Sequence, residues 1–191
     1  MTNYYFTSDL HFAHDKSFLF KPRGFNSTEE MCETIVQKWN NKIKADDVVF
    51  ILGDLILTDN EKGKYYLSYL NGIKFFVRGN HDSKNRLEIY HDVGINDLGW
   101  AHTFQYKPQN VKWKYNFYLS HFPTFTGNEF EPHISQQYIN LFGHTHQKDN
   151  FFQDNYFMYH VGLDSHNCEP VHIDDILYDV GKKYAENNFK I

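Results

Sequence analysis

The sequence predicts an α/β protein in which two mixed β-sheets stack face to face and helices flank them. The first 80 residues alternate strand, helix, strand, helix, strand, which is typical of a parallel sheet with right-handed crossovers. Most segments after residue 100 have the pattern of strands. The 191 residues contain no linker-like stretch and no internal repeat, so we expect a single domain over residues 1–191.

In the first half, one helix is marked by its N-terminus. The run from Ser27 to Glu30 forms a capping box, and Met31, Ile35 and Trp39 follow at four-residue spacing, which predicts an amphipathic helix of about 14 residues. The other elements follow from short apolar runs that end in Gly, Asp or Asn. They are the strands Tyr4–Ser8, Val48–Leu52 and Ile73–Val77 and the helix Lys62–Leu70.

The second half is richer in strands. Its apolar and alternating runs predict five strands and one closing helix. These are the strands Phe104–Lys107, Lys114–Ser120, Tyr138–Phe142, Tyr156–Val161 and Val171–Ile173 and the helix Asp174–Ala185.

Composition limits the partners and the compartment. Lys and Arg number 19 against 24 Asp and Glu, a formal charge of −5, so we expect no extended duplex DNA as a partner. The apolar runs are far shorter than the about 20 residues of a membrane-spanning helix, so no membrane partner is expected. Cys32 and Cys168 form no metal-binding pair, and two free thiols favour the cytoplasm. The oligomeric state stays open.

Polar clusters follow the predicted strands directly. Because ligands bind beyond the carboxyl ends of strands in α/β sheets, we expect these clusters to converge on one site. Carboxylate, amide oxygen and imidazole are ligands of divalent transition metals. Seven residues are too many for one tetrahedral ion and suit two metal ions that share a bridging carboxylate. The seven are Asp9, His11, Asp54, Asn80, His121, His144 and His146.

Taken singly, each cluster has a simpler explanation. Asp54 after Gly53 is also typical of a turn, and a lone His121 would more often be a half-buried core histidine. All five clusters in this order are much harder to explain as turns and core residues.

The five clusters resemble the motifs of the calcineurin-like metallophosphoesterases, in particular small prokaryotic and phage members. The family motifs are D-x-H, G-D, G-N-H-D or G-N-H-E, H and G-H-x-H. Here they correspond to Asp9-Leu10-His11, Gly53-Asp54, Gly79-Asn80-His81-Asp82, His121 and Gly143-His144-Thr145-His146. The resemblance implies the four-layer metallophosphoesterase fold, two stacked mixed β-sheets flanked by α-helices. It also implies hydrolysis of a P–O bond by a hydroxide that bridges two metal ions.

The resemblance also implies individual roles. Asp9, His11 and His146 would hold one metal; Asn80, His121 and His144 would hold the other; Asp54 would bridge them. His81 would act on the leaving group as a catalytic acid or charge stabiliser, and Asp82 is the neighbour best placed in sequence to orient it. We further expect substrate contacts from His14, Asn80 and His166, and the loop Gly162-Leu163-Asp164 is similar to a late loop beside the family's site.

The substrate class is less closely determined. No arginine follows Asp54 closely, unlike in the protein phosphatases of the superfamily, and few arginines lie near the motifs. We therefore expect a small phosphorylated substrate, more specifically a phosphodiester or nucleotide. The alternatives are a phosphomonoesterase on a small substrate and a non-catalytic scaffold with the same fold. We expect two divalent metal ions, with Mn first and Fe, Ni, Co or Zn as further candidates.

Overall fold

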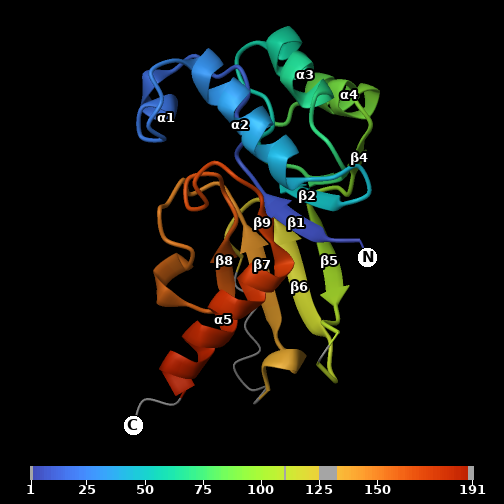
Figure 1. The fold of residues 1–191 in the computed structure, drawn as a ribbon, viewed down its shortest axis with the longest axis vertical. Helices are drawn as coiled ribbons and strands as arrows, with labels where there is room; N and C mark the ends of the chain where they lie inside the picture. Colours follow the sequence, from blue (N-terminus) through green and yellow to red (C-terminus); the bar gives the residue numbers. More distant parts are fainter. Residues whose placement is uncertain (1, 110, 125–132, 189–191) are drawn as a thin grey trace.

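The computed structural model describes residues 2–109, 111–124 and 133–188. Its first sheet has the strand order β4-β3-β2-β1-β9 (Figure 1). Four of the strands are parallel and β9 is antiparallel to β1. The strands are β1 (Tyr4–Thr7), β2 (Val48–Leu52), β3 (Ile73–Val77), β4 (Ile95–Asp97) and β9 (Val171–His172).

The second sheet has the order β5-β6-β7-β8. β5 is antiparallel to β6, whereas β6, β7 and β8 are parallel. The strands are β5 (Ala101–Tyr106), β6 (Tyr115–Ser120), β7 (Tyr138–Phe142) and β8 (Met158–His160), and the short 3-10 helices are η1 (Ile134–Gln136) and η2 (Phe152–Asp154).

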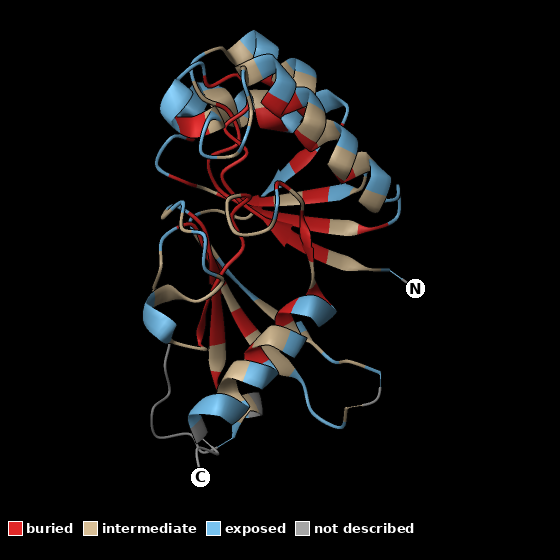
Figure 2. Ribbon diagram, turned by 60° about the vertical axis from the view of Figure 1, so that its left-hand side comes forward, coloured by how far each residue is buried: buried red, intermediate tan, exposed pale blue. Residues whose placement is uncertain are grey.

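Helices flank both sheets. Four cover one face of the first sheet, and α5 runs alongside the second (Figures 1 and 2). They are α1 (Ser17–Phe20), α2 (Thr28–Lys42), α3 (Asn60–Ser68), α4 (Lys84–Asp92) and α5 (Ile173–Asn188). None of the helices within the described residues is long and apolar enough to cross a membrane.

The central strand β2 of the first sheet is buried on both faces. Along β2, Val49 and Ile51 face the helices, whereas Phe50 and Leu52 face the core between the two sheets. This arrangement explains why β2 is an unbroken apolar run instead of an alternating one. The prediction of two stacked mixed sheets with flanking helices is confirmed.

Strongly apolar strands matched their predicted bounds, and weakly patterned elements did not. The bounds of β2, β3 and β7 are those predicted. We did not predict α1, α4 or β4. α4 buries one side chain, Tyr90, and β5 begins three residues before the predicted Phe104. His102 and Thr103 at the start of β5 are exposed, so α4 and this part of β5 carry little apolar signal in the sequence.

Candidate metal centre

The predicted site residues lie in loops at the C-terminal ends of the strands. Asp9 and His11 follow β1, Asp54 follows β2, and the remaining predicted ligands follow β3, β6 and β7. Backbone hydrogen bonds join these loops. The amide of Asp9 donates to Gly53 O (3.1 Å) and that of His11 to Asp54 O (3.0 Å). The polar clusters therefore meet at one edge of the stacked sheets, as we expected from their positions after the strands.

The backbone is left-handed at five of the seven predicted ligands. The φ angles are 57° at Asp9, 47° at His11, 58° at Asp54, 67° at His144 and 49° at His146. This conformation is uncommon for residues other than glycine and costs about 1–3 kcal/mol at each strained position. Strain gathered on these residues indicates a functional site, because selection for stability alone would relax it.

The motif glycines allow the loops to approach one another. A Cβ on Gly143 would lie 2.1 Å from Ser8 Oγ and 2.4 Å from Asp9 Oδ2. The amide of His144, the next residue, donates to Asp9 Oδ2 at 2.9 Å. Any side chain at position 143 would push the His144 loop away from Asp9.

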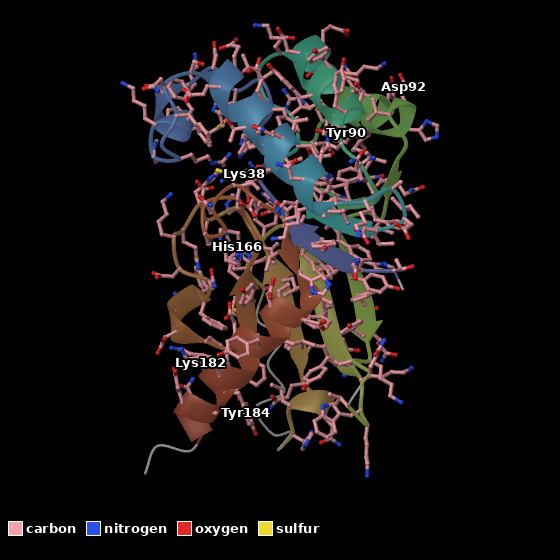
Figure 3. The ribbon with its side chains drawn as sticks, in the orientation of Figure 1. Lys38, Tyr90, Asp92, His166, Lys182 and Tyr184 are labelled. Atoms are coloured by element: carbon pink, nitrogen blue, oxygen red, sulfur yellow. The ribbon has the colours of Figure 1, made fainter. Side chains whose placement is uncertain are left out.

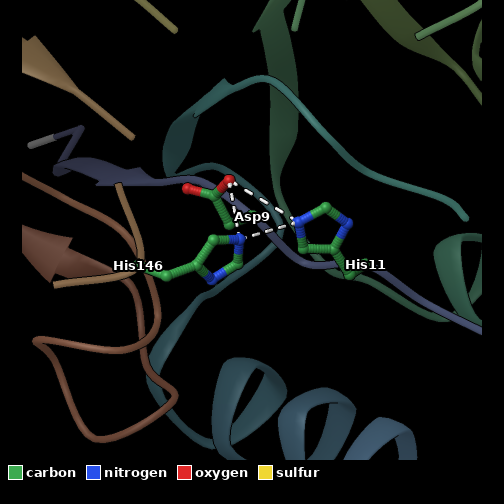
Figure 4. A group of neighbouring side chains, drawn as sticks. All are labelled: Asp9, His11 and His146. Atoms are coloured by element: carbon green, nitrogen blue, oxygen red, sulfur yellow. Dashed lines mark hydrogen bonds and ion pairs between the residues drawn. The ribbon is translucent and has the colours of Figure 1, made fainter. Parts of the chain in front are cut away.

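Asp9, His11 and His146 form the first group of candidate ligands (Figure 4). The Nε2 atoms of His11 and His146 are 3.2 Å apart, and Asp9 Oδ1 lies 3.7 Å from the first and 3.8 Å from the second. His146 Nδ1 lies 2.8 Å from Asp164 Oδ2, which leaves Nε2 directed at the group. Three donor atoms thus face one point.

Asp54, His121 and Asn80 lie beside this first group. His121 Nδ1 donates to Leu52 O at 2.8 Å, so its Nε2 faces Asn80 Oδ1 at 3.0 Å and Asp54 Oδ2 at 3.4 Å. Asp54 Oδ2 is also 3.8 Å from His11 Nε2. Asp54 therefore lies between the two sets of ligands, as a bridging carboxylate would.

Two further ligand atoms complete the description of this second set. An oxygen of Asp9 lies close enough to Asp54 and His121 to share a cation with them. His144 comes near through its ring, whose centroid is 5.1 Å from that of His121. The structure thus brings all seven predicted ligands together; how they divide between two ions stays a prediction.

The donor atoms fit a divalent cation. Asp9 Oδ1 is buried and has no hydrogen-bond partner within the described residues, although a buried carboxylate oxygen without a partner is costly. Burial lowers the pKa of His11 well below its ordinary value, so the ring is neutral and free to bind a metal. A bound cation would satisfy the unpaired Asp9 oxygen and would be coordinated by the Nε2 atoms of His11 and His146.

Asp54 and His121 are an ion pair when no cation is bound. Burial acts against both charges, but the hydrogen bond between the two groups outweighs it, and the pKa of Asp54 falls to about 2. The same contact, with the charge of Asp9, raises the pKa of His121 to about 9. A metal ion would have to displace this proton, so metal affinity should rise with pH.

His81 and Asp82 do not form the pair that the sequence predicted. The ring of His81 is partly exposed, with Nε2 3.9 Å from Asp54 Oδ2. Asp82 is buried and accepts hydrogen bonds from the amides of Asp54 (2.9 Å) and Gly79 (2.7 Å) and from the Tyr90 hydroxyl (2.7 Å; Tyr90 is labelled in Figure 3). The expectation that Asp82 orients His81 is therefore wrong. Asp82 fixes the Asp54 loop against α4.

The two remaining histidine predictions have different outcomes. His14 is buried beside the site, with its ring centroid 5.9 Å from that of His11 and Nδ1 3.1 Å from Thr58 Oγ1. His166, labelled in Figure 3, instead directs Nε2 at His160 O, 2.8 Å away. It lines a pocket of about 170 Å³ that none of the predicted ligands lines. The structure does not bring His166 to the predicted ligands, because its ring turns toward β8; a substrate contact from His166 stays a prediction.

A buried Arg23–Asp164 ion pair supports the first group, and the sequence did not reveal Arg23. Arg23 Nη2 is 2.7 Å from Asp164 Oδ2 and 2.9 Å from Asp9 O. Asp164 also accepts from His146, so the arginine and the histidine share one carboxylate. The available signal was a lone arginine between Pro22 and Gly24, in a chain with only three arginines.

Together, the layered fold and this gathering of carboxylate, amide and imidazole groups define a two-sheet α/β protein with a candidate metal centre. Residues 2–186 match the model of the calcineurin-like phosphoesterase family, and the chain belongs to this family.

The chain is also similar to an archaeal protein and to two phage proteins. An uncharacterised protein of Methanocaldococcus jannaschii is 43% identical over 84 residues, 43% of this chain and 48% of that protein. The gene 66 protein of Mycobacterium phage L5 is 37% identical over 87 residues, 43% of this chain and 41% of its own length. These matches therefore span less than half of either relative. The gene 66 protein of Mycobacterium phage D29 is 28% identical over 191 residues, 90% of this chain and 93% of its own length.

The fold also has a counterpart among solved structures. A crystal structure of a protein of unknown function from Aquifex aeolicus superposes with a TM-score of 0.66 at 19% identity, covering 93% of this chain and 99% of that one. At this identity the likeness shows the fold alone.

Proposed function

We propose that the chain hydrolyses the P–O bond of a phosphodiester or nucleotide with the help of two divalent metal ions. The observation that supports a diester substrate is that each of the three arginines is hydrogen-bonded to a partner other than the side chains of the predicted metal ligands. A phosphomonoester dianion is typically held by an arginine fork in addition to the metals. A diester carries one negative charge and needs no such second clamp.

All three arginines are engaged elsewhere. Arg23 pairs with Asp164, and Arg78 pairs with Asp97. Arg86 donates to His81 O (2.6 Å) and to Asn60 Oδ1 (3.0 Å). Within the described residues, no hydrogen bond joins any of them to the side chain of a predicted ligand, and these contacts hold each of them to other partners.

The metal ions would be held by the seven ligands in the predicted division. Asp9, His11 and His146 would bind one ion and Asn80, His121 and His144 the other, with Asp54 between them. When bound, such a pair activates water and neutralises charge on the phosphoryl oxygens. Mn is our first choice, and Fe, Ni, Co and Zn suit the same mixed oxygen and nitrogen ligands.

His81 is the residue that would handle the leaving group. Its ring is partly exposed and its Nε2 lies near Asp54, while the Asp54 Oδ1 atom accepts from the His81 amide at 3.0 Å. This hydrogen bond fixes the His81 backbone to the bridging residue and leaves the ring free. A protonated His81 would give the proton at Nε2 to the departing alkoxide.

The test is hydrolysis by protein freed of metal and then reloaded with each candidate ion. Bis(p-nitrophenyl) phosphate and p-nitrophenyl phosphate share a leaving group and differ in being diester and monoester. We expect the larger kcat/KM for the diester. A larger value for the monoester would instead establish the phosphomonoesterase, and bound metal without turnover of either ester would favour the non-catalytic scaffold.

A further inference from the structure

Two exposed phenylalanines lie near the metal centre, Phe122 against its second set of ligands and Phe18 against His14. Phe18 on α1 is 73% exposed, and Phe122 after β6 is 41% exposed. Single exposed apolar side chains are ordinary on a protein surface. The position of these two, on opposite sides of a polar site, is what suggests a role in binding.

Each ring touches an imidazole of the site. The ring centroid of Phe18 lies 5.4 Å from that of His14, which in turn lies 5.9 Å from His11 of the first group. The ring centroid of Phe122 lies 4.7 Å from that of His144 and 5.1 Å from that of His121, both of the second set. The two phenylalanines thus end a row of rings whose middle is the metal centre.

We propose that the preferred diester carries a flat aromatic ring on each side of the phosphate, as a dinucleotide does, and that Phe18 and Phe122 each stack on one of these rings. The inference rests on the proposed phosphodiesterase function and specifies its substrate. The two alcohol groups of a diester lie on different sides of the phosphorus atom, so a substrate with a ring on each alcohol offers one ring to each phenylalanine. Base–aromatic stacking is tolerant of sequence, because every base has a π-face.

Other features favour a short substrate. The chain has a formal charge of −5, which disfavours a long nucleic-acid track. On the Phe18 side, Thr58, which pairs with His14, also lines a cavity of about 380 Å³ together with Phe20 and Tyr66. None of the predicted ligands lines this cavity, which is connected to the centre through the contact between Thr58 and His14 and has room for one nucleoside arm.

The test compares two esters that share one leaving group. Methyl p-nitrophenyl phosphate has one ring, and thymidine 5′-(p-nitrophenyl phosphate) has a second ring on the other side of the phosphate. We expect a KM for the thymidine ester that is lower by roughly fivefold to a hundredfold, the usual effect of one base stack. Thymidylyl-thymidine, with two bases, is the substrate for the variants.

The variants separate stacking from simple apolar contact. Phe18→Ala and Phe122→Ala should each raise KM for thymidylyl-thymidine, and the dissociation constant of its non-hydrolysable methylene analogue, by roughly fivefold to a hundredfold. Phe→Trp at either position should retain binding, whereas Phe→Leu should not. Tyr178→Ala on α5, where the side chain is 74% exposed, is the matched control and should change neither constant.

The outcomes are distinguishable. Equal KM values for the two p-nitrophenyl esters in the wild type, or full binding by the leucine variants, would overturn the stacking proposal while leaving the phosphodiesterase intact. If metal-loaded wild-type protein turned over no diester at all, both proposals would fall together.

Discussion

Replacing Asp164 by asparagine tests whether the buried ion pair supports the metal centre. The side chains of Arg23 and Asp164 are 0% and 5% exposed, and they meet through contacts of 2.7 and 3.0 Å. Asparagine keeps the shape but loses the charge and one acceptor oxygen. Its amide oxygen can take the place of Oδ2, which accepts from both Arg23 Nη2 and His146 Nδ1, but its NH2 group then faces the Nε–H of Arg23, so this donor is left unpaired.

The expected loss follows from this burial. Removing one partner of a buried ion pair costs about 3–5 kcal/mol, and we expect the lower end because Arg23 keeps its hydrogen bond to Asp9 O. For a chain of 191 residues, a loss of about 3 kcal/mol lowers Tm by about 6–12 °C. His146 exchanges a charged acceptor at Nδ1 for a neutral one, which holds its ring less firmly, so metal affinity should fall about tenfold to a hundredfold.

The assay is urea unfolding of the metal-free protein, followed by metal titration of the folded variant. Asp97→Asn is the matched control, because Asp97 pairs with Arg78 in the same way but both side chains are about one-third exposed, 32% and 31%. An exposed pair contributes about 0–1 kcal/mol, so this control should unfold almost as the wild type does. Equal losses of stability in the two variants, or unchanged metal affinity in Asp164→Asn, would refute the reasoning.

Three further predictions concern the motif residues. Asp54→Asn should remove metal from both positions and nearly all activity, and full metal content with high turnover would mean that another residue bridges. His81→Gln should keep both metals but lower kcat by roughly 10²–10⁴, less for p-nitrophenyl esters, whose leaving group needs no proton; equal losses for good and poor leaving groups would indicate charge stabilisation instead. Gly143→Ala places a Cβ 2.4 Å from Asp9 Oδ2, so metal binding should be weak even in protein that folds, as metal titration with circular dichroism would reveal.

The ligands could be predicted from the sequence because their positions are set by local order. Each motif directly follows an apolar strand, and parallel strands present their carboxyl ends at one edge of a sheet. The unbroken apolar run Val48–Leu52 therefore both predicts a buried strand and places Asp54 beyond its end. His121 followed in the same way from β6, and its ring does reach Asp54.

Only the tertiary structure decided where the supporting side chains point. Asp82 follows His81 in sequence, yet its oxygens accept from the Asp54 amide and from Tyr90, a residue of a helix too polar to be predicted. His166 is near the late loop in sequence but turns toward β8. Arg23 reaches Asp164 across 141 positions of the chain. Neighbouring residues in a loop can face opposite directions, and the choice between them depends on segments that only folding brings close.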